Sequence, residues 1–216
     1  MKRTFTIIGL GTFGSTLARE LSRLGNDVIG IDLNPELVSE VADSIAQAAV
    51  ADARDEKALH DLGVHECDVV VVAIGENMEA NLLATLNVKA MQKPEVWAEA
   101  LDHSHHQILK KLGADHIVHP EHEMGLRLAN TLMYPGVMDY ISLGHELFMV
   151  EIRASERLAG QGMEALHLAE HDITCLLVKH RREALAPPPA DYILREDDQI
   201  VLLGTLDNLK KISKYL

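Results

Sequence analysis

A glycine-rich loop near the amino terminus carries the first chemistry that this sequence suggests. Gly9, Gly11 and Gly14 form a Gly-x-Gly-x-x-Gly pattern, with Thr12 and Phe13 between the second and third glycines. The loop follows an apolar run and precedes a segment with helical spacing, which is the context in which this pattern binds dinucleotides. There the first glycine permits a tight turn, the second lets the backbone approach a pyrophosphate, and the third lets helix and strand pack closely. The N–H groups and positive end of the helix would then bind phosphate.

Side chains after the next predicted strands could hold the rest of a nucleotide. Asp32 ends the second strand, at the distance from the loop where an acid accepts hydrogen bonds from ribose hydroxyls and disfavours the 2′-phosphate of NADP. Asp52 follows the third strand and can accept a hydrogen bond from an adenine amine, although a loop-capping role is the alternative. Ile74 and Gly75 end the fourth strand, where an apolar side chain can stack on the base and glycine leaves room.

The elements that would position these residues alternate regularly between strand and helix up to about residue 130. The run VVVVAI at 69–74 is apolar throughout, as in a central parallel strand covered on both faces. This α/β pattern predicts a doubly wound parallel sheet, and Met133-Tyr134-Pro135-Gly136 then interrupts it. We therefore expect a Rossmann nucleotide-binding domain over 1–133, a hinge at 134–139 and a small α+β domain over 140–216.

The second region is predicted from shorter signals. We expect strands at 147–152, 174–179 and 199–203 and helices at 163–167 and 206–216. Residues 181–190 contain three consecutive prolines and are expected to form a loop or hairpin arm.

The composition limits the classes of partner. The chain has 216 residues, of which 47% are hydrophobic and 25% charged, as in an ordinary soluble globular protein. A net charge of −13 disfavours binding to nucleic acid or to an anionic membrane surface. No apolar run approaches the roughly 20 residues that cross a bilayer, and the glycine pattern argues against a signal peptide. We expect a cytosolic protein in which Cys67 and Cys175 are free thiols rather than a disulfide.

The whole chain resembles the RCK (KTN) regulatory proteins of bacterial potassium uptake systems, the KtrA/TrkA type. The resemblance rests on IIGLGTFGSTLARELSRLG, IDLNPELV, VADARDEKALHDLGV, VVVVAIGENMEANLLATLNVKAM and HHQILKKLGADHIVHPEHEMGLRLA. It implies a Rossmann lobe, a hinge and a small RCK C domain, with homodimers assembled into an octameric ring under a membrane-embedded potassium-translocating subunit. It also implies that ATP and ADP, or NAD and NADH, shift the ring between conformations that open or close the pore.

Two positions depart from the pattern that this resemblance implies. Thr12 stands where KtrA-type members commonly carry an arginine, and Glu99 stands where members often carry a lysine. Glu121 is expected nearby, so the phosphates would meet too little positive charge, and we expect little preference for ATP over ADP. Two alternatives follow: a ligand with fewer charges (NAD(H), ADP or AMP), or a divalent cation such as Mg²⁺ or Ca²⁺ that bridges the phosphates to Glu121 across a subunit interface.

We expect a sensor with no catalytic residues, because the second region lacks the acid, base and substrate anchor that a dehydrogenase needs. The alternative is a small NAD-dependent oxidoreductase. The histidines at 103–122 are interpreted as structural rather than as a metal site, and the small domain as a dimerisation module, although some relatives bind cyclic di-AMP there. A Gly136→Val change is expected to keep nucleotide affinity and lose the change in ring shape. The expected nucleotide-binding residues are Gly9, Gly11, Thr12, Phe13, Gly14, Asp32, Leu33, Asp52, Ala53, Ala73, Ile74, Gly75, Asn77, Glu99 and Glu121.

Overall fold

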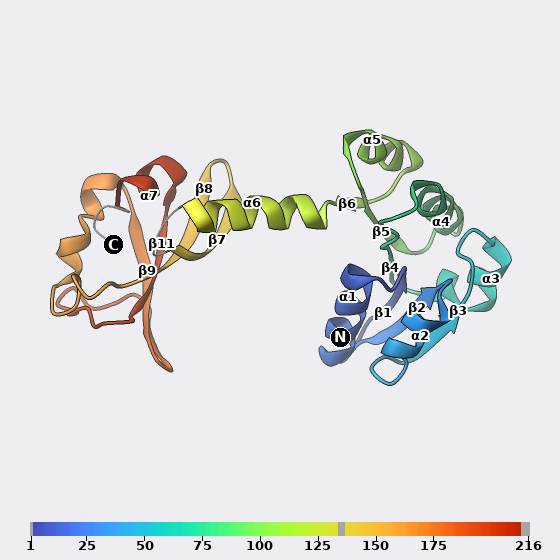
Figure 1. Ribbon diagram of the computed structural model, residues 1–216, viewed down its shortest axis with the longest axis horizontal. Helices are drawn as coiled ribbons and strands as arrows, with labels where there is room; N and C mark the ends of the chain where they lie inside the picture. Colours follow the sequence, from blue (N-terminus) through green and yellow to red (C-terminus); the bar gives the residue numbers. More distant parts are fainter. Residues whose placement is uncertain (1, 134–136, 213–216) are drawn as a thin grey trace. The chain divides into compact units, whose positions relative to one another are not determined.

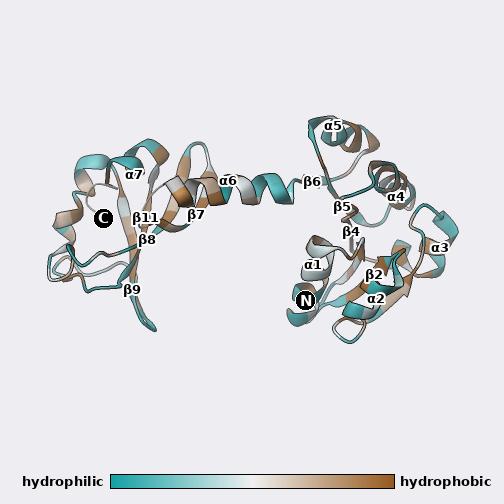
Figure 2. Cartoon of the chain, viewed as in Figure 1, coloured by the Kyte–Doolittle hydropathy of each residue, from teal (hydrophilic) through white to brown (hydrophobic). Residues whose placement is uncertain are grey.

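The chain folds into two compact units, Met1–Glu121 and His122–Leu216. The structure is a computed structural model that describes residues 2–133 and 137–212 (Figure 1). Brown apolar residues run along the strands of each unit in Figure 2, as expected where strands form the centre of a hydrophobic core. No helix among the described residues is long and apolar enough to cross a membrane.

The first unit is built on a six-stranded parallel sheet in the order β3-β2-β1-β4-β5-β6. Its strands are β1 (Thr4–Ile8), β2 (Asp27–Asp32), β3 (Gln47–Val50), β4 (Val69–Val72), β5 (Glu95–Glu99) and β6 (His116–Val118). This confirms the predicted doubly wound fold. The strand order reverses between β1 and β4, and in such sheets ligands bind in the crevice at the carboxyl ends of the strands beside this switch point.

Helices connect the strands of this sheet. They are α1 (Thr12–Arg23), α2 (Pro35–Val41), α3 (Glu56–Asp61), α4 (Met78–Ala90) and α5 (His103–Leu112), with a 3-10 turn, η1, over Val64–Glu66. Short polar side chains begin four of them: Asn34 accepts from the Glu36 N–H, Asp55 from the Lys57 N–H, Asn77 from the Ala80 N–H, and Asp102 from the His105 N–H. β4 is buried along its whole length, in agreement with its unbroken apolar sequence.

One aromatic contact joins the last two strands of the first unit. Trp97 of β5 stacks on His116 of β6, with ring centroids 4.0 Å apart. The Trp97 indole N–H donates to Glu95, and the His116 Nε2 lies 3.1 Å from the same carboxylate. The three side chains therefore fix the register of β6 against β5.

The second unit contains a five-stranded antiparallel sheet in the order β10-β9-β11-β8-β7. Its elements are α6 (Pro120–Met133), whose first turn begins in the first unit, β7 (Val137–Gly144), β8 (Leu147–Arg153), the 3-10 turns η2 (Met163–Leu166) and η3 (Ala169–His171), β9 (Thr174–His180), β10 (Glu183–Leu185), β11 (Gln199–Thr205) and α7 (Leu206–Ile212). A separate hydrophobic core includes Ile152, Leu166 and Ile200. This unit is the small α+β domain that the sequence predicts.

The second unit differs in detail from the sequence prediction. The two compact units divide between Glu121 and His122, in the first turn of α6, and Arg127 of α6 pairs with Asp139 of β7 inside the second unit (Nε to Oδ1 2.8 Å). Of the predicted hinge, residues 134–136, including Gly136, lie outside the described residues, and 137–139 begin β7. The helix predicted at 163–167 is the 3-10 turn η2, and β10 forms within the predicted loop or hairpin arm.

Candidate functional site

A cavity of about 630 Å³ opens at the carboxyl edge of the parallel sheet in the first unit. Its wall is formed by the glycine loop, by the residues that follow β2, β3, β4 and β5, and by the first turn of α6. Of the residues expected to bind a nucleotide, those that line the cavity are Gly9, Gly11, Thr12, Phe13, Asp32, Leu33, Asp52, Ala53, Ala73, Ile74, Gly75, Asn77, Glu99 and Glu121. Gly14 lies outside the lining. The fold thus brings together residues that are far apart in the sequence.

The three glycines of the loop have different surroundings. Gly9 has a φ of +97°, and a Cβ there would lie 2.4 Å from the carbonyl oxygen of Ala73. A Cβ on Gly14 would lie 1.9 Å from the carbonyl oxygen of Gly9, so Gly14 allows α1 to pack on the loop. Nothing lies within 4 Å of a Cβ on Gly11, and no side chain among the described residues caps the start of α1. The N–H groups of this helix end therefore face open space, where an anion can bind.

Asp32 is held at the cavity by two backbone hydrogen bonds. Its Oδ2 accepts from the Leu10 N–H at 2.7 Å, and its Oδ1 accepts from the Asn34 N–H at 2.8 Å. A carboxylate has about four acceptor positions, so Asp32 can still accept hydrogen bonds from a diol.

Asp52 forms an ion pair with Arg54, a cavity residue that was not predicted from the sequence. The guanidinium contacts both carboxylate oxygens, with Nε 2.9 Å from Oδ1 and Nη2 2.7 Å from Oδ2, and its hydrogen bonds lower the pKa of Asp52. The Asn87 amide of α4 donates to the carbonyls of Ala53 and Arg54 and so fixes this loop. Arg54 is the one Arg or Lys among the described lining residues. Its position two residues after Asp52 was the available signal.

Glu99 lies at the opposite end of the cavity and is only 3% exposed. A Cβ on Gly75 would lie 3.0 Å from its Oε1, and no described residue donates a hydrogen bond to its carboxylate. Burial raises the pKa of Glu99, and the negative charge of Glu121 raises it further. The Asn81 amide of α4 donates to the carbonyls of Ile74 and Glu99, which holds the ends of β4 and β5 in place.

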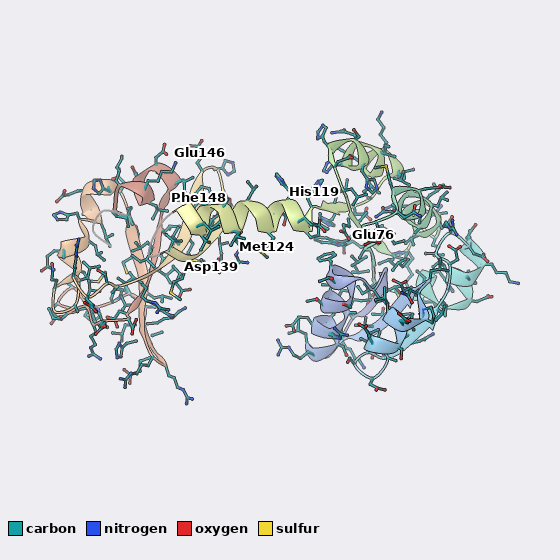
Figure 3. All side chains as sticks on the ribbon, in the orientation of Figure 1. Glu76, His119, Met124, Asp139, Glu146 and Phe148 are labelled. Atoms are coloured by element: carbon teal, nitrogen blue, oxygen red, sulfur yellow. The ribbon has the colours of Figure 1, made fainter. Side chains whose placement is uncertain are left out.

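The cavity is strongly acidic. Its ionisable lining residues are Asp32, Asp52, Arg54, Glu76, Glu99 and Glu121. Glu76, labelled in Figure 3, lies just before α4 and is exposed. Because Asp52 already pairs with Arg54, the one Arg or Lys among the described lining residues, a ligand meets an excess of negative charge, as Thr12 and Glu99 in the sequence predict.

The histidines near the start of α6 do not form a metal site within the part of the chain that the structure describes. His106 and His119 approach each other, with Nδ1 2.9 Å from Nε2, and their rings are stacked (His119 is labelled in Figure 3). Among the described residues, no group of three or more His, Cys, Asp or Glu side chains is placed to hold a metal ion. A cation bound by Glu121 across a subunit interface stays a prediction.

The sequence matches two domain families and is similar along nearly its whole length to known proteins. The TrkA-N domain matches residues 5–120, and the TrkA-C domain matches residues 147–216. The Ktr system potassium uptake protein A of Bacillus subtilis (strain 168) is 36% identical over 210 residues, which cover 97% of this chain and 95% of that protein. The Ktr system potassium uptake protein C of the same strain is 35% identical over 99% of this chain and 97% of that protein.

Solved structures show the same fold. The GsuK channel superposes with a TM-score of 0.67 at 18% identity, over 97% of this chain and 38% of that chain. The GsuK channel bound to NAD superposes with a TM-score of 0.56 at 20% identity, over 99% of this chain and 38% of that chain.

Proposed function

Because the chain belongs to the family of proteins that combine a TrkA-N with a TrkA-C domain, we propose that it is the nucleotide-binding regulatory subunit of a potassium uptake system. Its relatives in Bacillus subtilis are named as Ktr potassium uptake proteins, and the similarity extends over nearly the full length of both chains. Such a subunit acts on a membrane-embedded potassium-translocating partner from the cytoplasmic side. Homodimers assembled into an octameric ring would transmit the nucleotide signal to that partner.

The cavity of the first unit is the observation that carries this proposal. The glycine loop and the uncapped start of α1 are suited to phosphates, and Asp32 is suited to ribose hydroxyls. Asp52, with its Arg54 partner, and Ile74 would flank an adenine base. This arrangement supports an adenine nucleotide as ligand: ADP, ATP, NADH or NAD, the last of which is bound in a solved structure of the GsuK channel.

A sensor of this kind needs no chemical step. A ligand shifts the equilibrium between two conformations by as much as its affinities for them differ. Nucleotide bound in the first unit would favour one arrangement of the ring, and the partner would open or close in response. An oxidoreductase, in contrast, would consume its dinucleotide.

Calorimetric titration of the nucleotide-stripped full chain tests the proposal. ATP, ADP, NAD⁺ and NADH would be titrated with and without Mg²⁺ or Ca²⁺, and the solution then analysed for reaction products. We expect saturable binding of at least one of them and no turnover. Asp32→Asn should weaken that binding by about tenfold, because it removes a charge-assisted hydrogen bond.

Asp43→Asn is the matched control, because Asp43 is exposed and lies outside the cavity lining. It should bind like the unmodified chain. If none of the four nucleotides bound, the first unit would not be a nucleotide sensor. Hydride transfer to a small substrate would favour the oxidoreductase instead.

A further inference from the structure

The cavity extends on both sides of the glycine loop. In the strand order of the sheet, β2 and β3 lie on one side of β1, and β4, β5 and β6 lie on the other. Asp32, Asp52 and Arg54 follow the strands of the first side, which we name the adenosine half. Glu99 and Glu121 follow the strands of the other side, which we name the acidic half. Dinucleotides bind to doubly wound sheets across this crevice, with one nucleoside in each half.

The acidic half contains a carboxyl group that faces the cavity without a hydrogen-bond donor among the described residues. Glu99 is almost fully buried, lines the cavity and receives no hydrogen bond on its carboxylate from the described residues. Burial of an unpaired carboxylate is costly, and the group must gain a proton or a positively charged or donating partner. The other ionisable groups of the cavity are Glu121 from α6, Glu76 before α4, Asp32 after β2 and the paired Asp52 and Arg54 after β3. None of the described residues supplies a free cation to this half.

We propose that Glu99 selects a ligand that presents a cationic ring to the acidic half, which is the oxidised form of nicotinamide adenine dinucleotide. The proposal rests on the proposed function, because it requires that the adenosine half bind an adenine nucleotide. The nicotinamide ring of NAD⁺ is positively charged and carries a carboxamide N–H donor. The reduced ring of NADH is neutral, and the terminal phosphates of ATP would meet the like charge of Glu99 and Glu121.

The size of the effect follows from charge separation. Two opposite charges about 5 Å apart, at the effective dielectric constant of a protein surface, interact strongly enough to change an affinity by tenfold or more. Glu99 should therefore make the affinity for NAD⁺ at least about tenfold higher than that for NADH, although the two ligands differ only in the nicotinamide ring.

The test is a calorimetric comparison of four ligands on the nucleotide-stripped full chain: NAD⁺, NADH, ATP and ADP-ribose, which is NAD⁺ without its nicotinamide. We expect NAD⁺ to bind about tenfold more tightly than NADH or ADP-ribose. Glu99→Gln keeps the shape of the side chain and removes its charge. It should abolish the preference for NAD⁺, leave ADP-ribose affinity within about twofold and tighten ATP binding.

Glu40→Gln removes the same charge from an exposed position on α2 outside the cavity, and it should leave the four affinities in their original order. The affinity of ADP-ribose for Glu99→Gln also reports whether this variant is folded. It does so because ADP-ribose keeps the adenosine, the pyrophosphate and the second ribose of NAD⁺ and lacks only the nicotinamide that Glu99 would contact.

The pH dependence of NAD⁺ affinity gives a second test. It would not change with Glu99 if this residue had only a structural role. A cationic ligand favours the ionised carboxylate, so NAD⁺ binding should release a proton, and its affinity should rise with pH through the raised pKa of Glu99. NADH affinity should stay flat over the same range, and Glu99→Gln should flatten the NAD⁺ profile.

The possible results separate this inference from the proposed function. Equal affinity of the unmodified chain for NAD⁺ and NADH, or a preference that survives in Glu99→Gln, would overturn the role of Glu99 while ADP-ribose binding still supported a nucleotide sensor. Failure of all four ligands to bind would overturn both.

Discussion

At the scale of single residues, Glu99 is an uncommon choice for the end of β5, a strand that pairs on both sides. Its neighbours Val96 and Ala98 in β5 are buried and apolar, and α4 and β6 pack around its backbone. A glutamine would fit the same space at lower electrostatic cost. A charge kept at a costly position is typical of binding sites, where function opposes stability.

The electrostatic cost of Glu99 predicts how the stability of the ligand-free protein depends on pH. The folded-state pKa of Glu99 is raised, so its stabilising contribution is complete below the ordinary glutamate pKa and is lost as pH rises through the folded value. Glu99→Gln lacks this loss and should therefore raise the free energy of unfolding at neutral pH, with a much smaller gain near pH 4. Urea unfolding of both chains over this pH range measures the difference. A gain that does not change with pH would show that charge is not its cause.

Most residues of the candidate site could be predicted from the sequence, but the ion pair of Arg54 and the burial of Glu99 could not. The glycine loop, Asp32 and Ile74 could be placed from their positions after predicted strands, because parallel strands end at one edge of a sheet. Arg54 was missed because an arginine near an aspartate is common on surfaces, and only the folded loop shows that it lines the cavity. The depth of Glu99 likewise depends on what covers it in three dimensions.

At the scale of elements, two of the three loop glycines allow α1 to pack against the end of β1. The third glycine has no packing role. Gly9 and Gly14 bring backbone atoms closer than any Cβ would allow, whereas Gly11 faces open space. The same sequence pattern therefore contains two packing positions and one position that is free to face a ligand.

Two alanine substitutions should separate these roles. Gly14→Ala places a methyl group against the Gly9 carbonyl and should cost at least about 1–3 kcal/mol in the free energy of unfolding. Gly11→Ala meets nothing within 4 Å, so the stability should change little while the new methyl group hinders approach of a pyrophosphate. Urea unfolding and nucleotide titration of both variants measure the two effects. The opposite pattern would mean that Gly11 is the packing residue.

The sequence predicted the elements of the first unit better than those of the second. Alternating apolar strands and capped helices gave the parallel sheet, since each signal is local. β7 was missed because its sequence, VMDYISLG, is mostly exposed or half-buried and carries no clear alternation. β10 spans three exposed residues and forms by pairing with β9, a contact that local sequence does not encode.

At the scale of the whole molecule, each unit has a hydrophobic core of its own. Leu59 and Val72 belong to a core of the first unit, and Leu166 and Ile200 to that of the second. The candidate nucleotide site lies within the first unit. We therefore expect a bound nucleotide to stabilise the first unit, and a core substitution in the second unit to affect a different unfolding transition.

Calorimetric unfolding of the full chain should show this separation. A bound nucleotide at about 100 times its dissociation constant should stabilise the first unit by about 2.7 kcal/mol and leave the second unchanged. Leu166→Ala should destabilise the second unit by about 2–5 kcal/mol without altering nucleotide affinity. Leu59→Ala should destabilise the first unit by a similar amount. A single transition that shifts in every case would show that the two units unfold as one.

The stacked pair of Trp97 and His116 supplies the protein with its own optical reporter. The chain contains one tryptophan, so its tryptophan fluorescence comes from the first unit alone. Trp97 lies on the same face of β5 as Glu99, two residues away, and a charge that approaches it should change its emission. Reduced nicotinamide absorbs light at the wavelengths that tryptophan emits. A bound NADH should therefore quench Trp97 by energy transfer, whereas NAD⁺ should not, so the two redox forms can be distinguished without a label.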